Sequence, residues 1–171
     1  RFPLEERQRR ETHIADTYGP SGMRPPRGIV IGTQVLEQSL DLDFDVMVSD
    51  LAPIDLLLQR AGRLHRHERT RPPAHNIARL WIEVELDDSG NIRFGEDRFY
   101  SEYILHKTWH AVRERDSIHL PRDYRTLIEL VYDEEEPADD SLAGYWQQLK
   151  ADQAHERDEA TLRLVGMPNP V

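Results

Sequence analysis

The sequence contains no cysteine among its 171 residues. Disulfide-stapled scaffolds, zinc sites built on thiolates and cysteine nucleophiles are therefore excluded. It also has no apolar run near the ~18 residues that a membrane-spanning helix needs. No secretory signal is recognisable, although the chain begins at Arg1 rather than at a methionine. From these absences we expect a protein that acts in the cytoplasm, away from membranes.

Apolar residues are also scarce, at 38% of the chain, whereas charged residues make up 32%. The length is about one domain's worth, on a prior of ~150 residues per domain. The net charge of −10 is unevenly spread, because residues 1–72 hold 11 basic and 11 acidic side chains and residues 73–171 hold 11 and 21. All of the net charge thus lies in the second part of the chain.

One stretch runs against this acidic balance. Five arginines gather around a single acidic residue, Glu68, and they are Arg60, Arg63, Arg66, Arg69 and Arg71. A local cluster of guanidinium groups can face phosphate whatever the sign of the whole molecule.

Hydropathy patterns divide the chain into an α/β part and a helical part. Two β-branched runs without alternation are typical of strands buried on both faces of a parallel sheet. We expect strands at residues 28–33, 45–50 and 77–86, a short helical turn at 34–40, and helices at 3–14, 53–64, 100–112, 121–132 and 142–164. The predicted domains are residues 1–86, an α/β layer, and residues 87–171, a helical and acidic extension.

The helix expected at residues 53–64 carries an unusual polar face. When helical spacing is continued to Arg66, the side chains of Gln59, Arg63 and Arg66 fall opposite a leucine stripe, within roughly 60° of one another. Two arginines three residues apart repel, and Gly62 inside a helix costs up to ~1 kcal/mol. An anionic ligand would offset both costs, since arginine grips phosphate oxygens bidentately. The alternative is an ordinary solvated arginine face.

A second polar segment follows the strand expected at residues 28–33. Its hydroxyl, amide and carboxylate side chains are Thr33, Gln34, Glu37, Gln38, Ser39 and Asp41. In open α/β sheets, ligands bind at the carboxyl ends of the strands, which is where this segment begins. A polar loop with a short capped helix is the alternative.

The two segments together resemble a known family. Thr-Gln-Val-Leu-Glu-Gln-Ser-Leu-Asp-Leu-Asp at residues 33–43 and Gln-Arg-Ala-Gly-Arg-Leu-His-Arg-His at residues 59–67 are similar to motifs V and VI of superfamily 2 helicases. The residues of these two motifs most resemble those of the CRISPR-associated helicase-nuclease of type I interference systems. This resemblance implies the second RecA-like lobe of a motor, N-terminally truncated, followed by a mainly helical extension.

The resemblance also implies roles for residues around ATP. Arg63 and Arg66 would be arginine fingers on the β- and γ-phosphates, stabilising the charge that develops during phosphoryl transfer. Gln59 would lie near the γ-phosphate and the attacking water. Asp41 would contact the ribose or hold an arginine finger in place.

Other residues of the two motifs would serve the DNA. The resemblance implies that Thr33 touches the backbone of the tracked single strand, with Gln34 and Ser39 as weaker candidates. Glu37 would couple the ATP and DNA sites.

Arg60 falls on the flank of the predicted helix rather than on the face of Gln59. We expect it to make a structural ion pair with Asp50 or Asp55. Its role would therefore be in the fold and not at a ligand.

Several parts of a complete motor are missing from the sequence. It has neither the Gly-x-x-x-x-Gly-Lys-Ser/Thr loop nor an Asp-Glu-x-His motif, and no His-Asp nuclease motif. The resemblance then implies half of an ATP site, completed with ATP and Mg²⁺ by the first RecA-like lobe. It implies single-stranded DNA, a nuclease domain and an RNA-guided multi-subunit surveillance complex as partners, and an isolated chain without activity. The rival hypothesis is a non-catalytic module that binds protein or nucleic acid.

No metal site is expected in this chain. His106 and His110 have the i, i+4 spacing of a helical zinc site, but the sequence lacks the glutamate of His-Glu-x-x-His and an obvious third ligand. A partly exposed helix face is the preferred interpretation of both.

Overall fold

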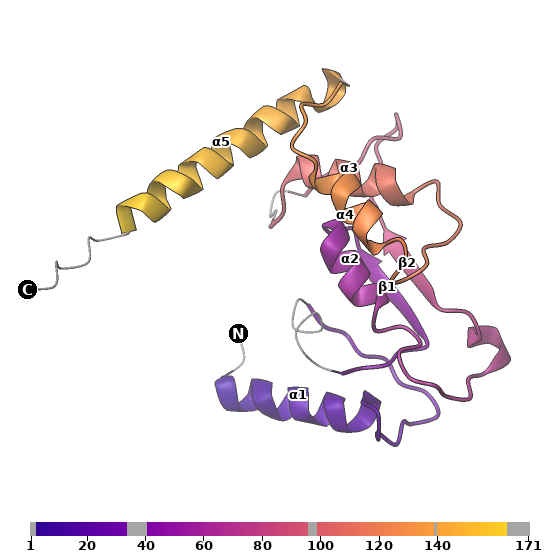
Figure 1. The fold of residues 1–171 in the computed structure, drawn as a ribbon. Helices are drawn as coiled ribbons and strands as arrows, with labels where there is room; N and C mark the ends of the chain where they lie inside the picture. Colours follow the sequence, from indigo (N-terminus) through magenta and orange to yellow (C-terminus); the bar gives the residue numbers. More distant parts are fainter. Residues whose placement is uncertain (1–2, 34–40, 96–98, 139, 164–171) are drawn as a thin grey trace, which may run out of the picture.

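The computed structural model describes residues 3–33, 41–95, 99–138 and 140–163. In Figure 1, α2 lies beside the two strands, α3 and α4 lie above them and α1 below, while α5 extends away from the body. The elements are α1 (Leu4–Tyr18), β1 (Val46–Asp50), α2 (Ile54–Ala61), the 3₁₀ turn η2 (Pro73–His75), β2 (Arg79–Glu83), α3 (Glu102–Val112), α4 (Tyr124–Tyr132) and α5 (Asp140–Arg163).

The predicted parallel sheet is confirmed in β1 and β2. Their register runs from Val46 opposite Arg79 to Asp50 opposite Glu83. The chain leaves β1 through Leu51, whose backbone N–H donates to the Glu83 carbonyl at 3.1 Å, and then enters α2. Strand, helix and parallel strand therefore follow one another, as a right-handed crossover unit requires.

Helix α2 begins directly after Pro53 and buries Ile54, Leu57 and Leu58. It ends at Ala61, three residues earlier than predicted, because Gly62 follows as the C-cap and Leu64 forms a parallel bridge with Phe44. The residues after Ala61 are thus drawn toward the sheet instead of continuing the helix.

The apolar core is shared between α2 and the helices that follow the sheet. Ile54 and Leu58 of α2 pack with Ala111 of α3 and with Leu127 and Val131 of α4. Burying a large aliphatic side chain contributes about 1.5–3 kcal/mol. The predicted helices at residues 100–112, 121–132 and 142–164 are confirmed as α3, α4 and α5. This core contains residues from both sides of residue 86, where the domain boundary is predicted.

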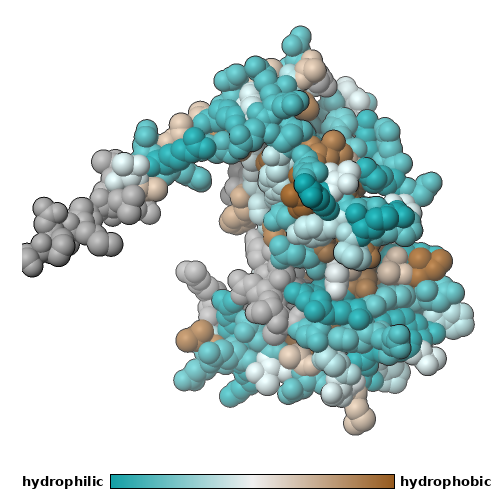
Figure 2. Space-filling model, viewed as in Figure 1, coloured by the Kyte–Doolittle hydropathy of each residue, from teal (hydrophilic) through white to brown (hydrophobic). Residues whose placement is uncertain are grey.

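Helix α5 contacts α3 near its beginning. Trp146 is buried against Tyr103 of α3, with ring centroids 5.0 Å apart. The rest of the helix is mostly hydrophilic, as is most of the visible face of the molecule (Figure 2). None of the helices in the described ranges is long and apolar enough to cross a membrane.

The prediction of a buried strand at residues 28–33 is wrong. Ile29 and Ile31 are 90% and 93% exposed, and these residues form no strand. Within the described chain β1 pairs with β2 alone, and residues 28–33 line the same hollow as β1 without pairing with it, so no ladder of hydrogen bonds covers them. The helical turn predicted at residues 34–40 lies outside the described residues.

Candidate functional site

The segment after α2 is held against the segment that leads into β1. The Phe44 N–H donates to the Arg63 carbonyl at 2.8 Å, and the His65 N–H donates to the Phe44 carbonyl at 3.1 Å. The Arg66 N–H then donates to a carboxylate oxygen of Asp43 at 2.8 Å. His65 has a φ of 49°, in the left-handed region, which marks the tight turn just before Arg66. These contacts fix the backbone that carries both predicted arginine fingers.

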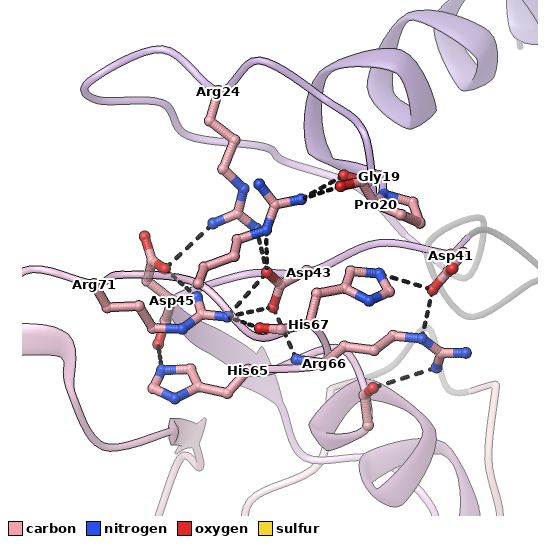
Figure 3. A network of polar contacts seen from close by, with 12 residues as sticks. Gly19, Pro20, Arg24, Asp41, Asp43, Asp45, His65, Arg66, His67 and Arg71 are labelled. Atoms are coloured by element: carbon pink, nitrogen blue, oxygen red, sulfur yellow. Dashed lines mark hydrogen bonds and ion pairs between the residues drawn. The ribbon is translucent and has the colours of Figure 1, made fainter.

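Asp43 is the centre of a polar network (Figure 3). Its side chain is fully buried, and Arg71 Nη2 lies 2.7 and 2.9 Å from its two oxygens. Arg69 Nε lies 2.9 Å and Arg24 Nη2 3.3 Å from Oδ2. Burial works to raise the pKa of Asp43, but the bonds and charges of Arg71 and Arg24 outweigh it and lower that pKa. The carboxylate therefore stays ionised inside the protein.

Asp45 extends the network on the same side of the chain. It forms ion pairs with Arg24, at 3.2 Å, and with Arg71. Its backbone carbonyl lies 3.2 Å from His65 Nε2. We call Arg24, Asp43, Asp45, Arg69 and Arg71 the Asp–Arg cluster.

Asp41 contacts a predicted arginine finger directly. Its Oδ1 lies 2.5 Å from Nε of Arg66 and 3.2 Å from Nε2 of His67. Both Asp41 and Arg66 are about half exposed, so this ion pair remains accessible to solvent and to a ligand. Both predicted roles of Asp41, holding an arginine finger and contacting ribose, stay predictions.

Arg63 lies beside this pair, at the edge of the hollow. Burial lowers the pKa of the Arg63 guanidinium, the charge of Arg66 lowers it further, and Asp41 opposes both. The group remains protonated, because arginine does not lose its proton in proteins. Two cationic side chains thus lie near each other, with one carboxylate acting on both.

The hollow has a volume of about 1150 Å³, and residues 28–33 and β1 are among the segments that line it. Thr33 and Arg63, predicted for DNA and for ATP, both line it. Thr33 is exposed, so its hydroxyl can meet a ligand. The structure therefore brings one residue of each predicted class to the same hollow.

The remaining residues of motif VI are placed by α2. Gln59 is exposed on the last turn of the helix. Arg60 Nη1 donates to the Ser49 hydroxyl at 2.6 Å and to the Asp50 carbonyl at 3.3 Å. These contacts tie α2 to the end of β1, while Asp55 accepts from the Tyr132 hydroxyl at 2.5 Å. The predicted structural role of Arg60 is thus compatible with its surroundings.

One argument behind the predicted arginine face is wrong. Arg63 and Arg66 lie beyond the end of α2, so helical spacing does not bring them together with Gln59. Gly62 is the C-cap and not an interior helix residue, so it carries no interior penalty. Gln34, Glu37 and Ser39 lie outside the described residues, and their predicted roles remain predictions.

Sequence reasoning missed the Asp–Arg cluster. A signal was present, because Asp41, Asp43 and Asp45 alternate, as do Arg69 and Arg71. Alternation with period two places side chains on one side of an extended segment. Opposite charges with the same period in two extended segments indicate that the segments face each other.

The two histidines of α3 have different surroundings. His106 is buried against the rings of Phe94 and Tyr145, whereas His110 is exposed, so the prediction of a partly exposed face is wrong for His106. Burial, and then the charge of His110, lowers the pKa of His106. Across the described ranges, no three histidine or acidic residues are grouped so that they could hold a metal ion.

The fold and this site define a class of protein. A parallel strand pair joined through a helix, with arginines just after that helix and helices packed behind it, is the architecture of a RecA-like helicase lobe followed by a helical part. Residues 1–69 match the family model described as CRISPR-associated nuclease/helicase Cas3, C-terminal. These similarities, with those below, relate the chain to the C-terminal part of the Cas3 nuclease/helicases.

A CRISPR-associated endonuclease/helicase Cas3 of Thermus thermophilus is 49% identical over 141 residues, which cover 80% of this chain and 15% of that protein. The crystal structure of T. fusca Cas3-ATP superposes with a TM-score of 0.82 at 35% identity, over 99% of this chain and 20% of that one. A chain in a CRISPR RNA-guided surveillance complex, pre-nicking, superposes with a TM-score of 0.78 at 34% identity, over 99% and 21%. This chain thus spans about a fifth of these relatives or less.

Proposed function

We propose that this chain supplies the second-lobe wall of the ATP site in a longer, ATP-dependent single-stranded DNA translocase of CRISPR interference. The observation that carries the proposal is the pair Arg63 and Arg66 after α2, held at the backbone by Phe44 and Asp43 and braced by Asp41. Guanidinium groups suit the γ-phosphate because charge develops on its oxygens in the transition state. Gln59, on the last turn of α2, would orient the attacking water.

The donor set fits a nucleotide better than it fits a metal ion. Two arginines and an amide can bind phosphate oxygens, and Asp41 can accept from a ribose hydroxyl. Mg²⁺ prefers carboxylate ligands and substrate phosphates. In our proposal the first RecA-like lobe supplies the Mg²⁺ ligands and the phosphate-binding loop, while this chain supplies cationic donors from the opposite side.

Single-stranded DNA would pass the same edge of the lobe. Thr33 lies exposed at the hollow that Arg63 also lines, and a hydroxyl there can donate to a phosphate. Gln34 and Ser39 would add weaker contacts, Glu37 would couple DNA to ATP, and Arg60 would hold α2 to β1. A nuclease domain and an RNA-guided surveillance complex are the proposed partners of the longer protein, which would act in the cytoplasm.

The test uses the longer polypeptide that carries both lobes. Arg63→Ala or Arg66→Ala should lower kcat for ATP hydrolysis by about 10³-fold, the scale of an arginine finger, and leave DNA affinity nearly unchanged. Thr33→Val is the matched comparison, which should weaken single-stranded DNA binding equally on every sequence and leave nucleotide affinity intact. Wild-type turnover in both arginine variants would refute the proposal.

The alternative is a non-catalytic module, and the isolated chain separates the two. Our proposal expects no ATPase activity above background from these 171 residues, with or without single-stranded DNA, because one wall of the site is present. If the longer polypeptide also lacks ATPase activity while the isolated chain binds a protein or nucleic acid, the hypothesis of a non-catalytic module is favoured.

A further inference from the structure

We propose that Asp43 is a positioning residue for Arg66, acting through the main chain and not through the ligand. This inference rests on the proposed function, since it assumes that Arg66 acts on ATP. Asp43 lies two residues beyond the motif V aspartate Asp41, and its carboxylate reaches the Arg66 N–H at 2.8 Å.

The chain is held on both sides of Arg66, by the main chain of Phe44 before it and by the Asp43 carboxylate after it. Toward the N-terminus of Arg66, the bridge between Phe44 and Leu64 fixes the turn at His65. Toward its C-terminus, Arg69 and Arg71 fold back so that both guanidinium groups reach the same carboxylate. The main chain of residue 66 is therefore held between two anchored points.

The anchors are themselves tied to other parts of the protein. Arg69 Nη2 donates to the carbonyls of Gly19 and Pro20 at 2.6 and 3.1 Å, just after α1. Arg71 Nη2 donates to the His67 carbonyl at 3.1 Å, which closes the turn onto itself. Figure 3 shows these side chains converging on Asp43 from several segments. A buried carboxylate with this many donors is a rigid support, because moving it would leave charges unpaired.

A rigid support at Asp43 affects ATP hydrolysis only if the rate depends on the position of Arg66. The Arg66 side chain is half exposed and contacts Asp41, so its place in space depends on where its main chain is held. A misplacement of about 1 Å at a reacting group can cost ~10²-fold in rate. In this proposal Asp43 affects catalysis by fixing the main chain of Arg66, while Asp41 orients its guanidinium group.

The experiment is a double-mutant cycle in the longer polypeptide that contains both lobes. Asp43→Asn should lower kcat for ATP hydrolysis by about 10²-fold with little change in KM for ATP. In an Arg66→Ala background, Asp43→Asn should have no further effect, because there is no arginine left to position. A merely structural role would reduce turnover by the same factor in both backgrounds, and that outcome overturns the inference.

Two further variants keep the test decisive. Asp45→Asn removes a carboxylate from Arg24 and Arg71, two of the three arginines bound to Asp43, without touching the Arg66 amide, and should change kcat by less than about threefold. An equal loss in both asparagine variants overturns the inference. If Asp43→Asn does not fold, Arg71→Lys, which keeps the charge but not the second guanidinium nitrogen that bridges Asp43 to Asp45, replaces it in the same cycle. A normal kcat for Arg66→Ala alone overturns the proposed function instead, so the two failures are distinct.

Discussion

The arginines after α2 have different surroundings although they lie close together in the sequence. Arg69 and Arg71 are bound to buried or partly buried carboxylates, whereas Arg63 lines the hollow and Arg66 contacts the half-exposed Asp41. The sequence predicted one cluster facing phosphate. Composition reveals the number of guanidinium groups, but which of them are neutralised depends on aspartates about 25 residues away, which only the tertiary structure brings near.

Asp123 has the clearest acid dependence of any single residue in the described chain. Its carboxylate accepts from the Arg122 guanidinium, with Nε at 2.8 Å, and from the His119 N–H at 2.7 Å. The Arg122 bond, followed by the His119 bond, lowers the pKa of Asp123 to about 2. The contribution of Asp123 to stability is therefore complete above the ordinary aspartate pKa of ~4 and is lost as pH falls toward 2.

We expect Asp123→Asn to lower Tm near pH 6 and to have a progressively smaller effect as pH falls from 4 to 2. Thermal melts followed by circular dichroism across this range measure the difference between variant and wild type. A difference that is constant from pH 6 to pH 2 would contradict the assignment.

Among the elements, helices were predicted better than strands. The apolar period of α3 and α4 suffices to locate them, because the buried residues Leu127 and Val131 recur at helical spacing. The run at residues 28–33 has the composition of a buried strand but no strand beside it in the described chain, and strand formation depends on that neighbour. The end of α2 was missed because Leu64 pairs with Phe44, a contact between distant segments.

Helix α4 offers a matched pair of leucines for testing the shared core. Leu127 is fully buried against α2, whereas Leu130 is 45% exposed. Leu127→Ala should lower the free energy of unfolding by about 2–5 kcal/mol. Leu130→Ala should cost under ~1 kcal/mol, as a partly exposed site loses less apolar burial. Urea denaturation of both variants measures the difference, and equal losses would contradict the packing of α4 on α2.

In the molecule as a whole, the helical part completes the α/β part. Ile54 and Leu58 of α2 are buried under residues of α3 and α4. The division at residue 86 was predicted from a change of charge and hydropathy pattern along the chain, and it stays a prediction. A core made by residues on both sides of that point cannot be recognised from composition, because packing partners are set by the fold.

A chain of residues 1–86 should therefore show no cooperative thermal transition, since it exposes the α2 side of the core. A chain of residues 1–138 keeps α3 and α4 and should melt cooperatively, at a lower Tm than the 171-residue chain, because Tyr103 loses Trp146. Calorimetry on the three chains measures this. Cooperative melting of residues 1–86 at the full Tm would instead establish residue 86 as a true domain boundary.

The hollow beside β1 also governs how the chain behaves in concentrated solution. Within the described residues β1 forms a sheet with β2 alone, and the apolar side chains near its other edge are open, with Val48 68% exposed and Ile29 and Ile31 more so. An open strand edge next to apolar side chains is a template for self-association. The net charge of −10 opposes this at neutral pH, and that protection vanishes near the isoelectric point of about 5.2. We therefore expect the isolated chain to be least soluble in mild acid, near this isoelectric point, and turbidity measured across pH checks it.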